Sequence, residues 1–309
     1  MNGDYHHVPV MTDEVVTYLR VIDRGLYVDC TLGGGGHSEA VLERGGCVVG
    51  IDRDPEAVAA ATERLAGYGD RFRALVTRFS LISEIAGIGP GTVDGIVMDL
   101  GVSSAMIDNP ERGFSYRHDG PLDMAMGGGS VTARDILMTG SEQELARIFR
   151  DYGEERHASR IARAAVSART RHPIDTTGEL ARVIEQSVPY MPHKSMARIF
   201  QALRIAVNEE LNELKTALES AERVLGDSGR LCVISYHSLE DRIVKNFMRE
   251  RADPCICPSD LPVCNCGRVP VLKLVTRKAQ RPSAEEVASN SRARSALLRV
   301  AEKLPGGEA

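Results

Sequence analysis

Apolar residues gather into four short runs within the first hundred positions. They lie at residues 26–30, 47–52, 72–77 and 93–99. Each run is rich in Val or Ile, which is typical of buried strands. Segments of helical spacing fill the intervals, at 38–44, 55–65 and 81–86. Asp54 and Pro55 predict a helix start, because Asp is a favoured N-cap and Pro a favoured first residue. The alternation predicts an α/β fold, a mostly parallel sheet with helices on both faces.

The pattern changes after residue 99. Apolar positions then recur at helical spacing, predicting helices over 142–150, 158–169, 179–187 and 196–224. A strand-like run returns at 230–235, followed by a helix over 239–251 and two further edge strands at 269–276 and 294–301. We therefore predict a helical domain, residues 107–225, inserted into a discontinuous α/β domain formed by residues 1–106 and 226–309.

A glycine-rich turn follows the first predicted strand. Residues Gly33 to Gly36 lack a Cβ, so the backbone can turn sharply there and a large ligand can approach its N–H groups. Asp52 ends the next strand, 19 residues after Gly33, a spacing at which an acid commonly binds a ribose diol. This pattern occurs in NAD-dependent dehydrogenases and in methyltransferases that use S-adenosylmethionine. The alternative is a flexible loop without a ligand.

A third acid, Asp99, ends the fourth strand and is followed by a glycine and two serines. Ligands of open α/β sheets bind at the carboxyl ends of the strands, so Asp99 is expected at the same edge as the glycine turn and Asp52. The structural alternative is a helix N-cap or a loop ion pair.

Charge is unevenly distributed along the 309 residues, although the net charge is only −5. Residues 156–204 contain nine Lys or Arg and three acids, and residues 268–299 contain eight and two, so each stretch carries about +6. Such local excess favours a polyanionic partner, although a solvated helix face is the commoner meaning of one basic run. Neither a signal peptide nor a membrane span is expected, which predicts a cytoplasmic protein without a membrane partner.

Several longer motifs identify a family resemblance. They are Asp-Cys-Thr-Leu-Gly-Gly-Gly-Gly-His-Ser at 29–38, Ile-Asp-Arg-Asp-Pro at 51–55, Met-Asp-Leu-Gly-Val-Ser-Ser at 98–104, Arg-Gly-Phe-Ser at 112–115, Gly-Pro-Leu-Asp-Met at 120–124, Tyr-Gly-Glu-Glu-Arg at 152–156, Phe-Gln-Ala-Leu-Arg-Ile-Ala-Val-Asn at 200–208 and Ser-Tyr-His-Ser-Leu-Glu-Asp-Arg at 235–242. With these motifs the chain resembles the bacterial ribosomal RNA small subunit methyltransferase H family, also called MraW. The likeness extends from His7-Val8-Pro9-Val10 to the segment 290–295.

The resemblance implies an S-adenosylmethionine-dependent enzyme that methylates the exocyclic amine (N4) of a cytidine in the decoding region of small-subunit (16S) ribosomal RNA. It also implies a class I, Rossmann-like methyltransferase fold, in which the inserted domain recognises the substrate. The expected partner is small-subunit rRNA, within the 30S subunit, and a homodimer is compatible with the resemblance.

The family's cofactor contacts fall on Gly35, Gly36, His37, Asp52, Phe79, Asp99 and Met106. The family has Gln where this chain has Met106, which removes a hydrogen-bonding amide, so only backbone or van der Waals contact with the cofactor is expected there. Asp99 is the catalytic candidate, because an acceptor that hydrogen-bonds the amine should assist transfer. A backbone carbonyl of residues 100–103 is the alternative. Tyr236 and His237 are expected at the same edge, either as substrate contacts or as structural supports of their loop.

Seven cysteines divide into two groups. Cys30, Cys47 and Cys232 lie in predicted strands and are expected to be small buried apolar residues. The others form Cys-x-Cys pairs six residues apart, at Cys255, Cys257, Cys264 and Cys266. Four thiolates this close could bind zinc. A reduced loop without metal and a disulfide remain equal alternatives.

Two other function classes fit parts of the sequence. One is an NAD-dependent oxidoreductase, disfavoured because no hydride-transfer acid or base is evident. The other is a nonenzymatic RNA-binding or assembly factor with a retained cofactor pocket. In either RNA-binding reading the backbone contacts are expected from the basic runs, at Arg156, Arg160, Arg163, Arg198, Arg204, Arg277, Lys278, Arg281, Arg292 and Arg294. Some of these arginines are expected to pair with Glu154, Glu155, Glu209 or Glu210 instead.

Overall fold

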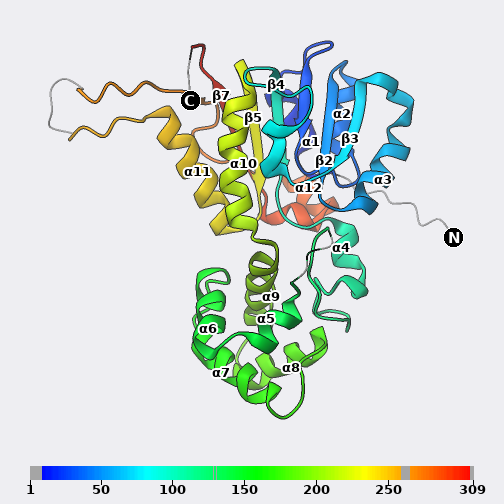
Figure 1. Ribbon diagram of the computed structural model, residues 1–309, viewed down its shortest axis with the longest axis vertical. Helices are drawn as coiled ribbons and strands as arrows, with labels where there is room; N and C mark the ends of the chain where they lie inside the picture. The colour runs from blue at the N-terminus through cyan, green and yellow to red at the C-terminus, as the bar shows by residue number, and fades with distance from the viewer. Residues whose placement is uncertain (1–8, 128, 130, 259–264, 307–309) are drawn as a thin grey trace. The chain divides into compact units, whose positions relative to one another are not determined.

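The computed structural model describes residues 9–127, 129, 131–258 and 265–306, and it divides the chain into two compact units (Figure 1). The sheet unit consists of residues 1–101 and 211–309, and the helical unit of residues 102–210. His7, Val8 and Cys264, which the sequence singles out, lie outside the described residues.

The sheet unit is built on seven strands in the order β3-β2-β1-β4-β5-β7-β6. Their bounds are β1 Leu26–Asp29, β2 Cys47–Asp52, β3 Phe72–Val76, β4 Val93–Asp99, β5 Leu225–Ser235, β6 Leu272–Leu274 and β7 Leu297–Lys303. Neighbouring strands from β3 to β5 are parallel, and β7 is antiparallel to both β5 and β6. This mostly parallel order is that of the class I methyltransferase fold, so the predicted fold class is confirmed.

Helices cover both faces of this sheet, because successive strand residues point to opposite sides. On one face, Val28, Ile96 and Val233 pack with α10 (Glu210–Val224) and α11 (Ser238–Ala252). On the other face, residues such as Tyr27 and Cys232 pack with α1 (Thr12–Leu19) and α2 (Gly36–Glu43). The remaining helices of this unit are α3 Pro55–Arg64, η1 Ala66–Arg71, η2 Phe79–Glu84, α12 Ala284–Ser289 and η4 Ser291–Ser295.

The helical unit has its own apolar core. Its elements are α4 Ser104–Asp108, η3 Pro110–Arg112, α5 Ala133–Thr139, α6 Glu142–Asp151, α7 Ala158–Arg169, α8 Thr177–Ser187 and α9 Pro192–Asn208. Capping boxes begin α5, α6 and α8, with Thr132, Ser141 and Thr176 as N-caps. Each cap of this kind contributes about 1 kcal/mol. Phe149, Ile161 and Ile199 are fully buried in this core, so the unit does not depend on the sheet for its packing.

The helix expected over 196–224 is two helices, and this moves the expected domain boundary. Glu209 has a left-handed backbone (φ 52) and separates α9 from α10. Leu214, Leu218 and Val224 of α10 then pack in the core of the sheet unit. The helical unit therefore spans residues 102–210, whereas the sequence predicts 107–225.

Smaller differences concern element type and length. The segment expected as a helix over 81–86 lies mostly in a short 3-10 helix, η2. Of the two expected edge strands, β6 covers three residues and β7 begins at Leu297 after η4. Within the described residues, none of the helices is both long and apolar enough to cross a bilayer.

Candidate active site

Three aspartates end three neighbouring strands of the sheet. Asp29 is the last residue of β1, Asp52 of β2 and Asp99 of β4, and the order of these strands is β2-β1-β4. Because the three strands are parallel, their carboxyl ends meet at one edge of the sheet. The local sequence thus brings three carboxylates to the edge at which ligands of such sheets bind.

The glycine turn has one open half and one packed half. A Cβ on Gly34 would meet nothing within 4 Å, whereas a Cβ on Gly36 would lie 2.6 Å from Cγ of Pro9. Gly35 has a left-handed backbone (φ 79), and a Cβ there would lie 3.0 Å from Leu65. Gly35 and Gly36 are therefore required by packing and backbone conformation. In the direction where a Cβ would point, Gly33 and Gly34 face no close neighbour, whereas Gly35 and Gly36 face packed side chains.

Asp52 is hydrogen-bonded to the glycine turn and to the start of the loop that follows β2. Its Oδ2 accepts a hydrogen bond from the amide of Gly33 (2.9 Å), and its Oδ1 accepts one from the amide of Asp54 (2.9 Å). Burial raises the pKa of Asp52, while these two backbone hydrogen bonds act to lower it. Asp54 in turn caps α3 by accepting from the amide of Glu56 (3.0 Å), as the sequence predicts. The carboxylate of Asp52 therefore has a fixed direction.

His37 lies buried between two of the acids. Its side chain is 4% exposed, and its Nε2 lies 3.5 Å from Oδ2 of Asp99, an ion-pair distance rather than a well-formed hydrogen bond. Neither ring nitrogen has a hydrogen-bond partner in the described part of the chain. Burial lowers the pKa of His37, but the attraction of Asp99, Asp29 and Glu286 outweighs it, so the pKa is raised. An unsatisfied buried imidazole at this place suggests a ligand atom beside it.

Asp29 is the most deeply buried of the three acids. It accepts hydrogen bonds from the hydroxyl of Ser38 (2.7 Å) and the amide of Thr31 (3.2 Å). Burial raises the pKa of Asp29, and the charge of His37 opposes that rise. No role for Asp29 is predicted from the sequence, although its position at the end of the first apolar run is the same signal that identifies Asp52 and Asp99.

Tyr236 holds Asp99 from the end of β5. Its hydroxyl donates a hydrogen bond to Oδ1 of Asp99 (2.8 Å), while the amide of Asp99 donates to the hydroxyl of Thr31 (2.7 Å). Burial, followed by the charge of Asp99, raises the pKa of Tyr236, so its hydroxyl stays protonated and remains a donor. The Tyr236 hydroxyl is thus held in a hydrogen bond to the carboxylate of Asp99.

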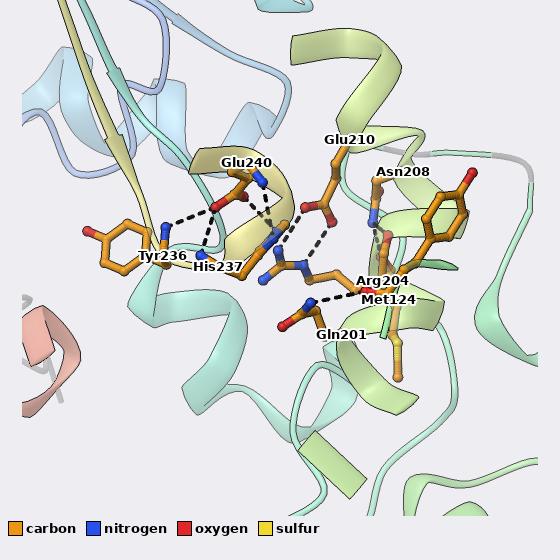
Figure 2. Close-up of polar contacts among 9 residues, drawn as sticks. Met124, Gln201, Arg204, Asn208, Glu210, Tyr236, His237 and Glu240 are labelled. Carbon is orange, nitrogen blue, oxygen red and sulfur yellow. Dashed lines mark hydrogen bonds and ion pairs between the residues drawn. The ribbon is translucent and has the colours of Figure 1, made fainter. Parts of the chain in front are cut away.

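His237 and Glu240 cap the start of α11, as Figure 2 shows for the sheet unit. The amide of Glu240 donates to Nδ1 of His237 (3.4 Å), and Oε2 of Glu240 accepts from the amides of Tyr236 (2.9 Å) and His237 (3.3 Å). His237 Nε2 also lies 3.0 Å from Oε1 of Glu240. These contacts agree with a structural role for His237, and they fix the backbone that carries Tyr236.

Two further residues of the expected cofactor set are Phe79 and Met106. Phe79 begins η2, three residues after the end of β3, and is partly buried against the core of the sheet unit. Met106 belongs to the helical unit, is 5% exposed, and donates from its amide to the hydroxyl of Ser103 (3.3 Å). The thioether of Met106 offers no strong hydrogen bond.

The donor set at the strand ends fits S-adenosylmethionine. That cofactor carries a sulfonium and an ammonium cation, a carboxylate, a ribose diol and an adenine. Carboxylates suit the cations and the diol, and the backbone amides at the N-terminal end of α2 suit the carboxylate. The unsatisfied nitrogens of His37 add a polar neighbour for such a ligand.

The arginines of the helical unit fall into two groups. Arg204 makes two 2.8 Å hydrogen bonds to Glu210, visible in Figure 2, and Arg198 lies 3.6 Å from Glu155. The sequence predicts that some of these arginines pair with such glutamates, without indicating which. Arg163 pairs with Glu142 (3.2 Å). Arg156 and Arg160 are exposed, and neither has an ion pair within the described residues. In the sheet unit, the predicted RNA contacts Arg277, Lys278, Arg281, Arg292 and Arg294 are all exposed.

Comparison with known proteins gives consistent matches over nearly the whole chain. The MraW methylase family matches residues 4–304. A protein named ribosomal RNA small subunit methyltransferase H from Carboxydothermus hydrogenoformans is 50% identical over 97% of this chain and 99% of its own length. Proteins of the same name from Symbiobacterium thermophilum (48% identical; 98% of each chain) and Citrifermentans bemidjiense (49%; 97% of this chain and 99% of the relative) match similarly.

Proposed function

The chain belongs to the MraW methylase family, and from this premise we propose that it methylates N4 of a cytidine in the decoding region of 16S ribosomal RNA, with S-adenosyl-L-methionine as the methyl donor. The names of its relatives support a small-subunit rRNA substrate. The observation that carries the proposal is the set of carboxylates at the ends of β1, β2 and β4, beside an open glycine turn.

Each cofactor group has a matching residue in this proposal. The oriented carboxylate of Asp52 binds the ribose hydroxyls, Phe79 covers one face of the adenine, and the amides at the turn before α2 bind the methionine carboxylate. The negative charges of Asp29 and Asp99 favour the cationic groups of the cofactor. When bound, the cofactor supplies a methyl group on a positively charged sulfur.

Asp99 acts on the substrate amine. The cytosine amine is a poor nucleophile because its lone pair is delocalised into the ring. A carboxylate that accepts a hydrogen bond from this N–H stabilises the positive charge that develops on nitrogen and then takes the proton. Asp99 keeps 16% of its side chain exposed, so it stays accessible while Asp29, at 3%, does not.

Tyr236 is a positioning residue for this step. Its hydroxyl occupies Oδ1 of Asp99 at 2.8 Å and fixes the rotation of the carboxylate. Oδ2 lies on the side of His37. Alignment of acceptor, amine and methyl supplies much of the rate in reactions of this kind.

Exposed arginines supply affinity for the RNA backbone. Phosphate contacts fix the position of a nucleic acid without reading its sequence. In this proposal Arg156 and Arg160 contribute from the helical unit, and the basic residues 277–294 contribute from the sheet unit.

Methyl transfer to isolated 30S subunits tests the proposal. The subunits are prepared from cells that lack the enzyme and are incubated with tritiated S-adenosylmethionine, with naked 16S rRNA in parallel. We expect tritium in the rRNA, and mass mapping should place one methyl group on N4 of a decoding-region cytidine. Incorporation at another base would overturn the assignment of the target. No incorporation into either substrate would contradict the proposal that the protein is an enzyme and would favour an RNA-binding factor instead.

A further inference from the structure

Three cysteines gather on the segment that links α11 to β6. The Sγ atoms of Cys255, Cys257 and Cys266 all lie within 4.8 Å of one another. We propose that these three thiolates bind a zinc ion that holds this segment in place. The site is separate from the strand-end aspartates and does not depend on the proposed methyl transfer.

The segment has no apolar core to hold it. Among its described residues, 253–258 and 265–270, none is buried, and Ile256 and Val269 are 66% and 65% exposed. In Figure 1 the two described arms leave the sheet unit after α11 and return toward β6. One backbone hydrogen bond, from the amide of Val271 to the carbonyl of Arg251 (2.9 Å), closes its base. A segment of this length needs another source of stability to hold three thiols together, and a metal is a common one.

The geometry suits a tetrahedral ion. With Zn–S bonds of about 2.3 Å, two sulfurs of a tetrahedral site lie about 3.8 Å apart. The three Sγ atoms need only a small adjustment to reach that spacing from within 4.8 Å. Gly267, directly after Cys266, has a left-handed backbone (φ 67), which allows the chain to turn at that point. A disulfide would join only two of the three sulfurs.

The position of the site indicates a structural role. It follows the C-terminal end of α11, whereas His237 caps the N-terminal end of the same helix beside Tyr236. Fifteen helical residues separate the two ends by about 22 Å. We therefore expect loss of the metal to loosen the segment while the affinity of the strand ends for S-adenosylhomocysteine changes less than about 2-fold, because the cysteines follow the opposite end of α11 from Tyr236.

Metal analysis of the full chain, purified under reducing conditions without chelator, tests the inference. We expect about one zinc per chain in the wild type and less than about a tenth of that in a variant with Cys255→Ser, Cys257→Ser and Cys266→Ser. Cys47→Ser, a partly buried cysteine of β2, is the matched control and should keep its zinc. Cobalt added to the metal-free wild type should give a thiolate-to-metal charge-transfer band that the triple variant lacks.

Tryptic cleavage after Arg268 supplies a readout of the segment itself. Chelation should accelerate this cleavage in the wild type and leave it unchanged in the triple variant. Three results would overturn the inference: reduced wild type that takes up no zinc from an equimolar solution, zinc retained in full by the triple variant, or iron with inorganic sulfide in place of zinc. Circular dichroism that matches the wild type shows that the triple variant is folded.

Discussion

The strand ends of the sheet unit and the surface around Arg156 and Arg160 in the helical unit arrange their charged groups in opposite ways. At the strand ends of the sheet unit, Asp29 and His37 are at most 4% exposed, and each carboxylate is held by backbone amides or hydroxyls. In the helical unit, Arg156 and Arg160 lie on the surface without an ion pair within the described residues. Buried and oriented charges suit chemistry, which depends on position, whereas exposed charges suit attraction to a polyanion, which does not.

The same contrast occurs inside one turn. Gly36 is packed against Pro9, while Gly34 faces open space. A run of four glycines thus combines two requirements, close packing for the fold and access for a ligand. If this contrast holds, substitutions at buried, oriented residues should change catalysis or stability, and substitutions at exposed residues should change ligand or RNA affinity.

Asp99→Asn should have the largest effect. The amide keeps the size of the side chain but cannot take a proton, so kcat should fall about 100-fold; the affinity for S-adenosylhomocysteine should fall as well, because the charge of Asp99 is also assigned to the cofactor. Single-turnover methyl transfer to 30S subunits measures the rate. Asp70→Asn is the control, since the side chain of Asp70 is 87% exposed and lies 3.7 Å from Arg24 at the surface. Normal turnover in Asp99→Asn would contradict the catalytic role.

Gly36→Ala and Gly34→Ala form a matched pair. A methyl group on Gly36 would lie 2.6 Å from Pro9, so the free energy of unfolding should fall by about 1–3 kcal/mol. Gly34→Ala should leave unfolding nearly unchanged and weaken S-adenosylhomocysteine about 10-fold, since its methyl group enters the space left for the ligand. Urea titration and calorimetry measure the two quantities. Equal effects of both substitutions on stability would remove the distinction between the halves of the turn.

Substitutions of exposed arginines and of paired arginines should affect different properties, RNA affinity and stability respectively. The double substitution Arg156→Gln and Arg160→Gln should reduce the slope of log K for RNA against log salt by about 1.4, because each phosphate that an arginine neutralises on a single strand accounts for about 0.7 of that slope. Arg204→Gln, which breaks the pair with Glu210, should instead lower the free energy of unfolding by about 1–2 kcal/mol and leave the slope unchanged. An unchanged slope in the double variant would show that this surface does not contact RNA.

The smallest expected effect is a pH dependence of stability from His37. Its pKa in the folded protein is raised above the ordinary value of 6.5. Its stabilising contribution is therefore fully present below about pH 6.5 and is lost as the pH rises through the folded-state pKa. The wild type should lose more stability than His37→Gln as the pH rises above about 6.5 in urea titrations. Parallel curves for the two proteins would contradict the raised pKa.

Local patterns predict most of the secondary structure in both units. The strand runs, the N-cap at Asp54 and the helix over 158–169 follow from signals within a few residues, and the structure agrees with them. The break at Glu209 has no such signal, because an acid in a helical run gives no reason for a left-handed backbone. The burial of α10 against the sheet depends on tertiary packing, so the boundary expected at residue 225 lies too far along the chain.

Local sequence signals likewise predict only part of the candidate site. The acids at 52 and 99 are predicted because each ends an apolar run, and such signals are local. The hydrogen bond between Tyr236 and Asp99 joins residues that are 137 positions apart in the chain. The packing of Gly36 on Pro9 joins residues that are 27 positions apart. Pairings of that kind follow from strand order, which no short motif encodes.

Calorimetric titration of the purified chain with S-adenosylhomocysteine tests the central claim that the strand ends form the cofactor site. The account predicts one binding site per chain, weakened at least about 10-fold by Asp52→Asn, because Asp52 is the residue assigned to the ribose, and unchanged by Asp70→Asn. Absence of binding heat over a range of temperatures, or equal affinity in Asp52→Asn and the wild type, would contradict it.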